Sequence, residues 1–136
     1  MTVALLGTGR MGSAMARAIS AGASSSALAG TLELVLWNRS PEPARALAAE
    51  LGARVVETPA EAARQAEICL TMLADQRAVE AVYAGPDGLI AGTSRGSILV
   101  DLSTVAPDSI RGLEAAVRAT GAGLLDAPVS GSVTTA

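Results

Sequence analysis

The chain of 136 residues has the length of one domain, and a chain of this size can bury a core of its own. Half of its residues are hydrophobic, but it contains one Trp, one Tyr and no Phe, so alanine, leucine and valine must build that core. A net charge of −3, scattered arginines and the absence of lysine argue against a nucleic-acid partner, and no apolar run approaches the ~20 residues of a membrane span.

The first half of the chain alternates a strand pattern with a helix pattern. Residues 2–6 form a short apolar run, which predicts a strand buried on both faces. The next segment predicts a helix with one buried stripe, formed by Met11, Ala14, Met15, Ala18 and Ile19. Residues 20–30 are nearly all small and predict a flexible surface connection, and residues 32–37 predict a second strand. A helix is then expected from Ser40-Pro41 to Gly52, with a buried stripe of Ala44, Leu47, Ala48 and Leu51.

The second half repeats this alternation. Strands are expected at residues 54–56, 67–73, 97–102 and 123–129. Thr58, Pro59 and Glu61 form a capping box with proline at the first helical position, so a helix begins there. Two more helices are predicted by their apolar spacing: one contains Val79, Val82 and Tyr83, and the other, which Gly121 ends, contains Pro107, Ile110, Leu113 and Val117. Repeated alternation of strand and helix predicts a doubly wound α/β fold with a mainly parallel sheet and helices on both faces.

Cys69 is the one cysteine of the chain and cannot form an internal disulfide, which fits a reducing, cytoplasmic compartment. Because it lies inside an apolar run, we expect it to be a small buried hydrophobe. The N-terminus enters a strand at once without a charged leader, so no signal peptide is expected. The chain also contains no histidine, and no metal site is predicted.

Residues 7–12 read Gly-Thr-Gly-Arg-Met-Gly and lie directly between the first strand and the first helix. In that position Gly7 allows a tight turn, Gly9 lets the backbone approach a diphosphate, and Gly12 allows close packing of helix and strand. The N–H groups at the helix start would hold the diphosphate. A plain strand-to-helix turn is the alternative, whereas a P-loop is excluded because it requires a lysine. The motif therefore predicts a Rossmann-type dinucleotide-binding domain over residues 1–136.

The other unusual residues follow the carboxyl ends of the predicted strands, which is where ligands bind in open α/β sheets. These segments are residues 38–40, 73–75, 103–104 and 128–132. Asp75 and Gln76 are interpreted as the beginning of a helix rather than as ligand contacts. Four loops that converge on one edge of the sheet strengthen the prediction of a dinucleotide site there.

The segment after the second strand indicates which dinucleotide is bound. An acidic residue there would hydrogen-bond the ribose 2′-hydroxyl of NAD(H), but the chain has Asn38, Arg39 and Ser40. A guanidinium group can hold a 2′-phosphate through paired, charge-assisted hydrogen bonds. We therefore predict a preference for NADP(H) over NAD(H); the alternative is that Arg39 is only a solvated charge near the start of a helix.

Four stretches resemble the β-hydroxyacid dehydrogenase family, which includes enzymes of the 3-hydroxyisobutyrate dehydrogenase and 6-phosphogluconate dehydrogenase type. They are GTGRMG at 7–12, WNRS at 37–40, DLST at 101–104 followed by Pro107, and DAPVSGS at 126–132. The last stretch is the most specific, because DAPVSG is typical of this family and not of Rossmann domains in general. The stretches occur in the order of the family and extend over nearly the whole chain.

The resemblance assigns roles to individual residues. It implies that Gly7, Thr8, Gly9, Arg10, Met11 and Gly12 hold the diphosphate, and that Asn38, Arg39 and Ser40 hold the adenosine ribose and its 2′-phosphate. It further implies that Leu73 and Ala74 line the cofactor cleft and that Thr104 lies beside the nicotinamide. Ser130, Gly131 and Ser132 match a Ser-Gly-Gly segment that binds the substrate carboxylate. Ser132 departs from that pattern, because it replaces a glycine.

The resemblance also implies a general acid that this chain does not contain. In the family a lysine of a following all-α domain protonates the carbonyl oxygen, and that domain commonly forms a homo-oligomer. The chain is thus expected to be the cofactor-binding part of an NADP-dependent oxidoreductase that acts on a small 3-hydroxy acid or its semialdehyde, and to be inactive alone. A non-catalytic NADP(H)-binding module and an enzyme of the imine reductase type are the alternatives. The expected partners are a small carboxylate substrate and the cofactor, with neither nucleic acid nor membrane.

Overall fold

The computed structural model describes residues 1–25, 27 and 30–130, and in this part of the chain six strands form one sheet. Every neighbouring pair of strands is parallel, and the spatial order is β3-β2-β1-β4-β5-β6. The strands are β1 (Thr2–Leu6), β2 (Glu33–Trp37), β3 (Arg54–Val55), β4 (Ile68–Thr71), β5 (Ile98–Asp101) and β6 (Gly123–Asp126). This is the strand order of the Rossmann fold, and the order reverses between β1 and β4. The predicted α/β, doubly wound fold is confirmed.

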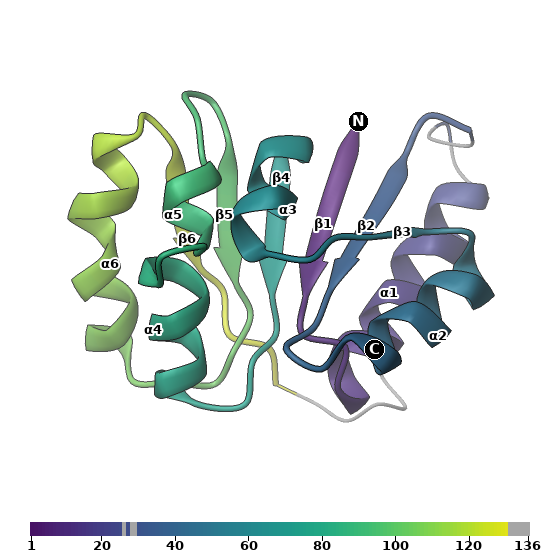
Figure 1. The fold of residues 1–136 in the computed structure, drawn as a ribbon, viewed down its shortest axis with the longest axis horizontal. Helices are drawn as coiled ribbons and strands as arrows, with labels where there is room; N and C mark the ends of the chain where they lie inside the picture. The colour runs from purple at the N-terminus through teal and green to yellow at the C-terminus, as the bar shows by residue number, and fades with distance from the viewer. Residues whose placement is uncertain (26, 28–29, 131–136) are drawn as a thin grey trace.

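Within the described residues, six helices cover the two faces of the sheet (Figure 1). They are α1 (Arg10–Ser24), α2 (Pro41–Leu51), α3 (Pro59–Gln65), α4 (Gln76–Ala84), α5 (Leu89–Gly92) and α6 (Pro107–Ala119). Buried residues of α1 and α2 pack on one face, around Leu5 and Leu36, and those of the other four helices pack on the opposite face, around Leu99 and Cys69. Alternate side chains along β1, β2 and β4 thus belong to two separate hydrophobic cores.

The predicted starts of four helices are confirmed. The Thr58 cap of α3 is present, because the Glu61 N–H donates to Thr58 Oγ1 at 3.1 Å. The Glu61 carboxylate accepts at 3.0 Å from the N–H of Glu57, one residue before the Thr58 N–H that a complete capping box would use. Asp75 caps α4 by accepting from the Ala78 N–H at 2.8 Å, as expected of a residue that begins a helix. Proline occupies the first position of α2, as it does in α3 and α6.

Two expectations about α1 were wrong. The helix continues to Ser24, into the segment predicted as a surface connection, because alanines favour the helix and the Ser24 hydroxyl donates to the Ser20 carbonyl at 2.9 Å. Its fully buried residues are Gly12 and Ala16, while Ala18, which belonged to the predicted stripe, is exposed. The helix approaches β1 so closely that its smallest residues face the sheet.

The remaining differences concern lengths and one helix. The strands predicted at residues 67–73 and 123–129 are shorter, because their last residues leave the sheet as loops. Helix α5 was not predicted, and it depends on tertiary packing: an added Cβ at Gly92 would lie 1.9 Å from the Ala60 carbonyl oxygen of α3. No helix in the described part of the chain is long and apolar enough to cross a membrane.

Candidate functional site

A cavity of about 760 Å³ opens where the carboxyl ends of β1, β2 and β4 meet, and helix α4 and the turn at Gly85 form its far wall. Ligand sites in proteins commonly measure about 300–1,000 Å³. Because β1 and β4 flank the reversal of strand order, this is the position at which Rossmann domains bind their ligands. Seven of the residues predicted to bind the cofactor line the cavity, namely Gly7, Gly9, Asn38, Arg39, Ser40, Leu73 and Ala74.

The three glycines of residues 7–12 have different surroundings. Gly7 has φ +101°, and an added Cβ would lie 2.2 Å from the Met72 carbonyl oxygen. An added Cβ at Gly12 would lie 1.8 Å from the Gly7 carbonyl oxygen. Gly9, in contrast, has no atom within 4 Å of its Cβ position and borders the cavity. Gly7 and Gly12 therefore let the backbone segments pack, whereas Gly9 leaves space that a bound group can occupy.

Asn38 connects the glycine turn to the loop after β2. Its Oδ1 accepts from the Thr8 N–H at 3.0 Å, and its Nδ2 donates to the Ser40 carbonyl oxygen at 2.9 Å. The sequence suggested only a contact to the ribose, and this bridging role was missed. Thr8 Oγ1 is buried and has no hydrogen-bond partner among the described residues, so the turn keeps an unused hydroxyl next to Gly9.

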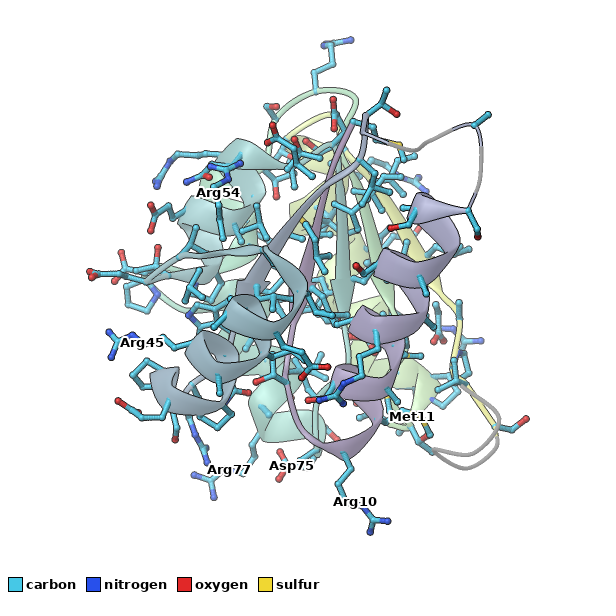
Figure 2. The ribbon with its side chains drawn as sticks, turned by 90° about the vertical axis from the view of Figure 1, so that its right-hand side faces the viewer. Arg10, Met11, Arg45, Arg54, Asp75 and Arg77 are labelled. Carbon is cyan, nitrogen blue, oxygen red and sulfur yellow. The ribbon has the colours of Figure 1, made fainter. Side chains whose placement is uncertain are left out.

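Two guanidinium groups belong to residues that line the cavity, those of Arg39 and Arg77. Neither forms an ion pair with another described residue, whereas five other arginines are paired with carboxylates. Figure 2 shows Arg77, Asp75 and Arg10 at the same end of the molecule. Sequence reasoning missed Arg77; the available signal was its position two residues after the helix cap Asp75, at the carboxyl edge of the sheet.

The remaining predicted site residues lie outside the lining of this cavity. Arg10 and Met11 occupy the first turn of α1, where the cap residue Gly9 has no side chain to accept from the N–H groups of that turn. Thr104 is exposed in the loop after β5, and Ser130 is exposed after β6. Gly131 and Ser132 lie outside the described residues. The structure thus assembles the diphosphate and adenosine side of the predicted site most completely.

Burial decides the chemistry of the two weak acids in the core. Burial raises the pKa of the Cys69 thiol to about 12, so this residue is the inert hydrophobe that its apolar surroundings predicted. Burial also raises the pKa of Tyr83, whose hydroxyl lies 3.0 Å from Thr71 Oγ1 at the carboxyl end of β4. Both groups therefore stay protonated at neutral pH.

Comparisons with known proteins match nearly the whole chain. The sequence family described as the NAD binding domain of 6-phosphogluconate dehydrogenase matches residues 2–136. An uncharacterized oxidoreductase, YfjR, of Bacillus subtilis is 36% identical over 96% of this chain and 43% of its own length. The 3-hydroxyisobutyrate dehydrogenase of Pseudomonas aeruginosa is 34% identical over 96% of this chain and 41% of its own length.

A solved structure of Psf3 in complex with NADP+ and 2-OPP superposes with a TM-score of 0.84, at 36% identity, over 97% of this chain and 44% of that chain. The chain thus spans about two fifths of the length of these relatives. The glycine turn, the strand order and the matched sequences all indicate a dinucleotide-binding domain of the Rossmann type. The chain belongs to the β-hydroxyacid dehydrogenase family and corresponds to its NAD-binding domain.

Proposed function

We propose that the chain is the cofactor-binding part of an NADP-dependent oxidoreductase that transfers a hydride between the nicotinamide and a small 3-hydroxy acid or its semialdehyde. The observation that carries the choice of NADP is the pair of guanidinium groups, Arg39 and Arg77, which line the cavity without ion pairs. The loop after β2 contains no carboxylate that would repel a 2′-phosphate. A 2′-phosphate group would supply acceptor oxygens for the N–H groups of both guanidinium groups.

The cavity fits a dinucleotide at its diphosphate side. The open space at Gly9 admits a phosphate group close to the backbone, and the first N–H groups of α1 are available to it. When bound, the nicotinamide would donate or accept the hydride. The residues of this chain would hold the diphosphate at residues 7–12 and hold the adenosine end at Asn38, Arg39 and Ser40.

The proposed substrate class rests on the segment after β6. Ser130 is exposed at the carboxyl edge, and a hydroxyl followed by backbone N–H groups is suited to a carboxylate. The chain contains no lysine or histidine that could protonate a carbonyl oxygen. We therefore propose that residues 1–136 bind the dinucleotide without turnover and that the proton donor belongs to a part of the enzyme beyond them.

The test is a titration of the chain with NADPH and with NADH, read by the fluorescence of Trp37, which lines the cavity and donates from Nε1 to the Glu57 carbonyl oxygen at 3.1 Å. We expect NADPH to bind at least about tenfold more tightly, and Arg39→Ala to remove most of that difference. The matched control is Arg45→Ala, because Arg45 pairs with Glu42 on the exposed side of α2 and does not line the cavity. Equal affinity for both dinucleotides would contradict the preference for NADP.

A further inference from the structure

A group of buried polar side chains joins the carboxyl ends of β4 and β5. Asp101, Thr71 and Tyr83 are each 0% exposed, and Ser103 is 1% exposed. Asp101 is the last residue of β5 and pairs in register with Thr71, the last residue of β4. Residues 101–104 carry part of the family resemblance, which assigns no role to Asp101. We refer to these four residues as the Asp101 cluster.

Hydrogen bonds account for both carboxylate oxygens of Asp101. Thr71 Oγ1 donates to Oδ2 at 2.6 Å, and the Ser103 N–H donates to Oδ1 at 2.9 Å. Because Thr71 donates to Asp101, the Tyr83 hydroxyl, 3.0 Å away, is left to donate to Thr71. No cation pairs with Asp101 in the described part of the chain. A buried carboxylate without a cation is costly, and hydrogen bonds from fixed donors are what compensate it here.

The cluster reaches the cavity through Ser103. Ser103 Oγ accepts from the N–H of Leu73 at 2.9 Å, and Leu73 is one of the residues that line the cavity. The preceding residue, Met72, carries the carbonyl oxygen that lies against Gly7, where an added Cβ would be 2.2 Å away. The loop after β4 is therefore held on one side by the glycine turn and on the other side by the Asp101 cluster.

The cluster also reaches the segment after β6. The Ala127 N–H donates to the Asp101 carbonyl oxygen at 2.8 Å, and the Val129 N–H donates to the Leu102 carbonyl oxygen at 3.4 Å. The backbone of Asp101 and Leu102 therefore fixes the position of residues 127–129. The loop after β4 thus meets the Asp101 cluster at the Ser103 hydroxyl, and the segment after β6 meets it at the backbone of Asp101.

We propose that Asp101 is a positioning residue that holds the loops after β4 and β5 at the distance from the glycine turn that the nicotinamide half of the dinucleotide requires. The inference rests on the proposed function, because it assumes that a dinucleotide lies across this edge of the sheet. The loop after β2, which we propose holds the adenosine half, bonds instead to the glycine turn through Asn38 and forms no hydrogen bond with the Asp101 cluster among the described residues. A change in the cluster should therefore affect one half of the cofactor and spare the other.

Two variants interrupt the cluster at different points. Asp101→Asn keeps the size of the side chain but replaces one acceptor with a donor, which conflicts with the hydroxyl that Thr71 donates. Ser103→Ala leaves the carboxylate in place and removes only the acceptor of the Leu73 N–H. The matched control is Ser97→Ala, because Ser97 is also buried (7% exposed) but precedes β5, at the opposite end of that strand.

The experiment measures the dissociation constants of NADPH and of 2′,5′-ADP, which lacks the nicotinamide half, for the chain and the three variants. We expect Ser103→Ala and Asp101→Asn to weaken NADPH by about tenfold, the effect of losing one or two buried hydrogen bonds, and to leave 2′,5′-ADP unchanged. Ser97→Ala should change neither constant. In Ser103→Ala and Asp101→Asn, the fluorescence emission of the reduced nicotinamide of bound NADPH should also differ from the emission measured with the parent chain. Thermal melting of each variant verifies that it is folded, and Ser103→Ala carries the test if Asp101→Asn is not.

The outcomes separate the inference from the proposed function. Equal losses for NADPH and 2′,5′-ADP would show that the cluster only supports the fold, and unchanged constants would show that it has no positioning role; both overturn the inference. If the parent chain binds neither compound, nor NADH nor ADP in the same assay, the proposed function fails and the inference fails with it. Binding of NADH and ADP alone would overturn the preference for NADP. The inference would then be tested by the same comparison with the dissociation constants of NADH and ADP.

Discussion

In the glycine turn, residues 7–12, two Gly→Ala substitutions should have opposite effects: one should lower stability and the other should weaken cofactor binding. Gly12→Ala places a methyl group where the Gly7 carbonyl oxygen would be 1.8 Å away, so the start of α1 must move away from the turn. Gly9→Ala places the same group where no atom lies within 4 Å, and the backbone at Gly9 (φ −68°, ψ −169°) is allowed for alanine. The two substitutions are chemically identical and differ only in their surroundings.

The expected magnitudes follow from these distances. Overpacking costs about 1–3 kcal/mol, and an overlap with backbone is at the upper end because the oxygen cannot rotate away. Alanine recovers up to about 1 kcal/mol inside a helix, so Gly12→Ala should lose about 2 kcal/mol net. For a chain of this size that corresponds to a melting temperature lower by about 6–8 °C. For Gly9→Ala the weaker cap and the stiffer unfolded chain nearly cancel, which leaves a change within about 0.5 kcal/mol.

The binding effects should be ordered in the opposite way. The Gly9→Ala methyl group occupies the space next to the first turn of α1 that the diphosphate needs, so the dissociation constant for NADPH should rise by at least about tenfold. Thermal melting and the Trp37 titration together test both expectations. A Gly12→Ala variant that melts like the parent chain would refute the packing argument. A Gly9→Ala variant that binds NADPH like the parent chain would refute the location of the diphosphate.

Three further predictions follow from the described contacts. Arg77→Ala should weaken NADPH by about three- to tenfold and NADH much less, in the fluorescence titration, because Arg77 would contact a phosphate that only NADPH has; an equal loss for both would contradict this. Thr58→Ala should lower the melting temperature by about 3–4 °C, through the loss of about 1 kcal/mol from the cap of α3. Burial raises the pKa of Cys69 from an ordinary 9.0 to about 12, which adds stability that is complete below pH 9 and is lost as the pH rises toward 12. The urea midpoint of unfolding should therefore fall between pH 9 and pH 12, and the folded chain should not react with a thiol reagent at pH 8. Rapid reaction of the folded chain would contradict the burial of Cys69.

Much of the molecule could be predicted from local patterns, because the relevant forces act between residues that are close in sequence. The apolar run of β1, the helix cap at Thr58 and the proline at the start of α6 each depend on a few neighbouring residues, and each is found as predicted. The glycine turn belongs to the same class, since its position between a strand and a helix is a local property. The family could be predicted as well, because each of the four stretches that carry the resemblance is a short contiguous motif.

Contacts between distant segments required the tertiary structure. Residues that lie 30 positions apart form the bond between Asp101 and Thr71 and the bond between Leu73 and Ser103, and no periodicity of the sequence records either pairing. The bridge from Thr8 to Asn38 also spans 30 positions. Which helix face is buried depends on how closely α1 approaches β1, and the place of Arg77 in the cavity depends on the direction in which α4 leaves the sheet. The sequence by itself determined the six strands, every described helix except α5, the glycine turn and the family, because these depend on residues that are close in sequence. Only the packed chain decided which side chains meet at the edge of the sheet, because burial and hydrogen bonding across the sheet act between segments that only folding brings together.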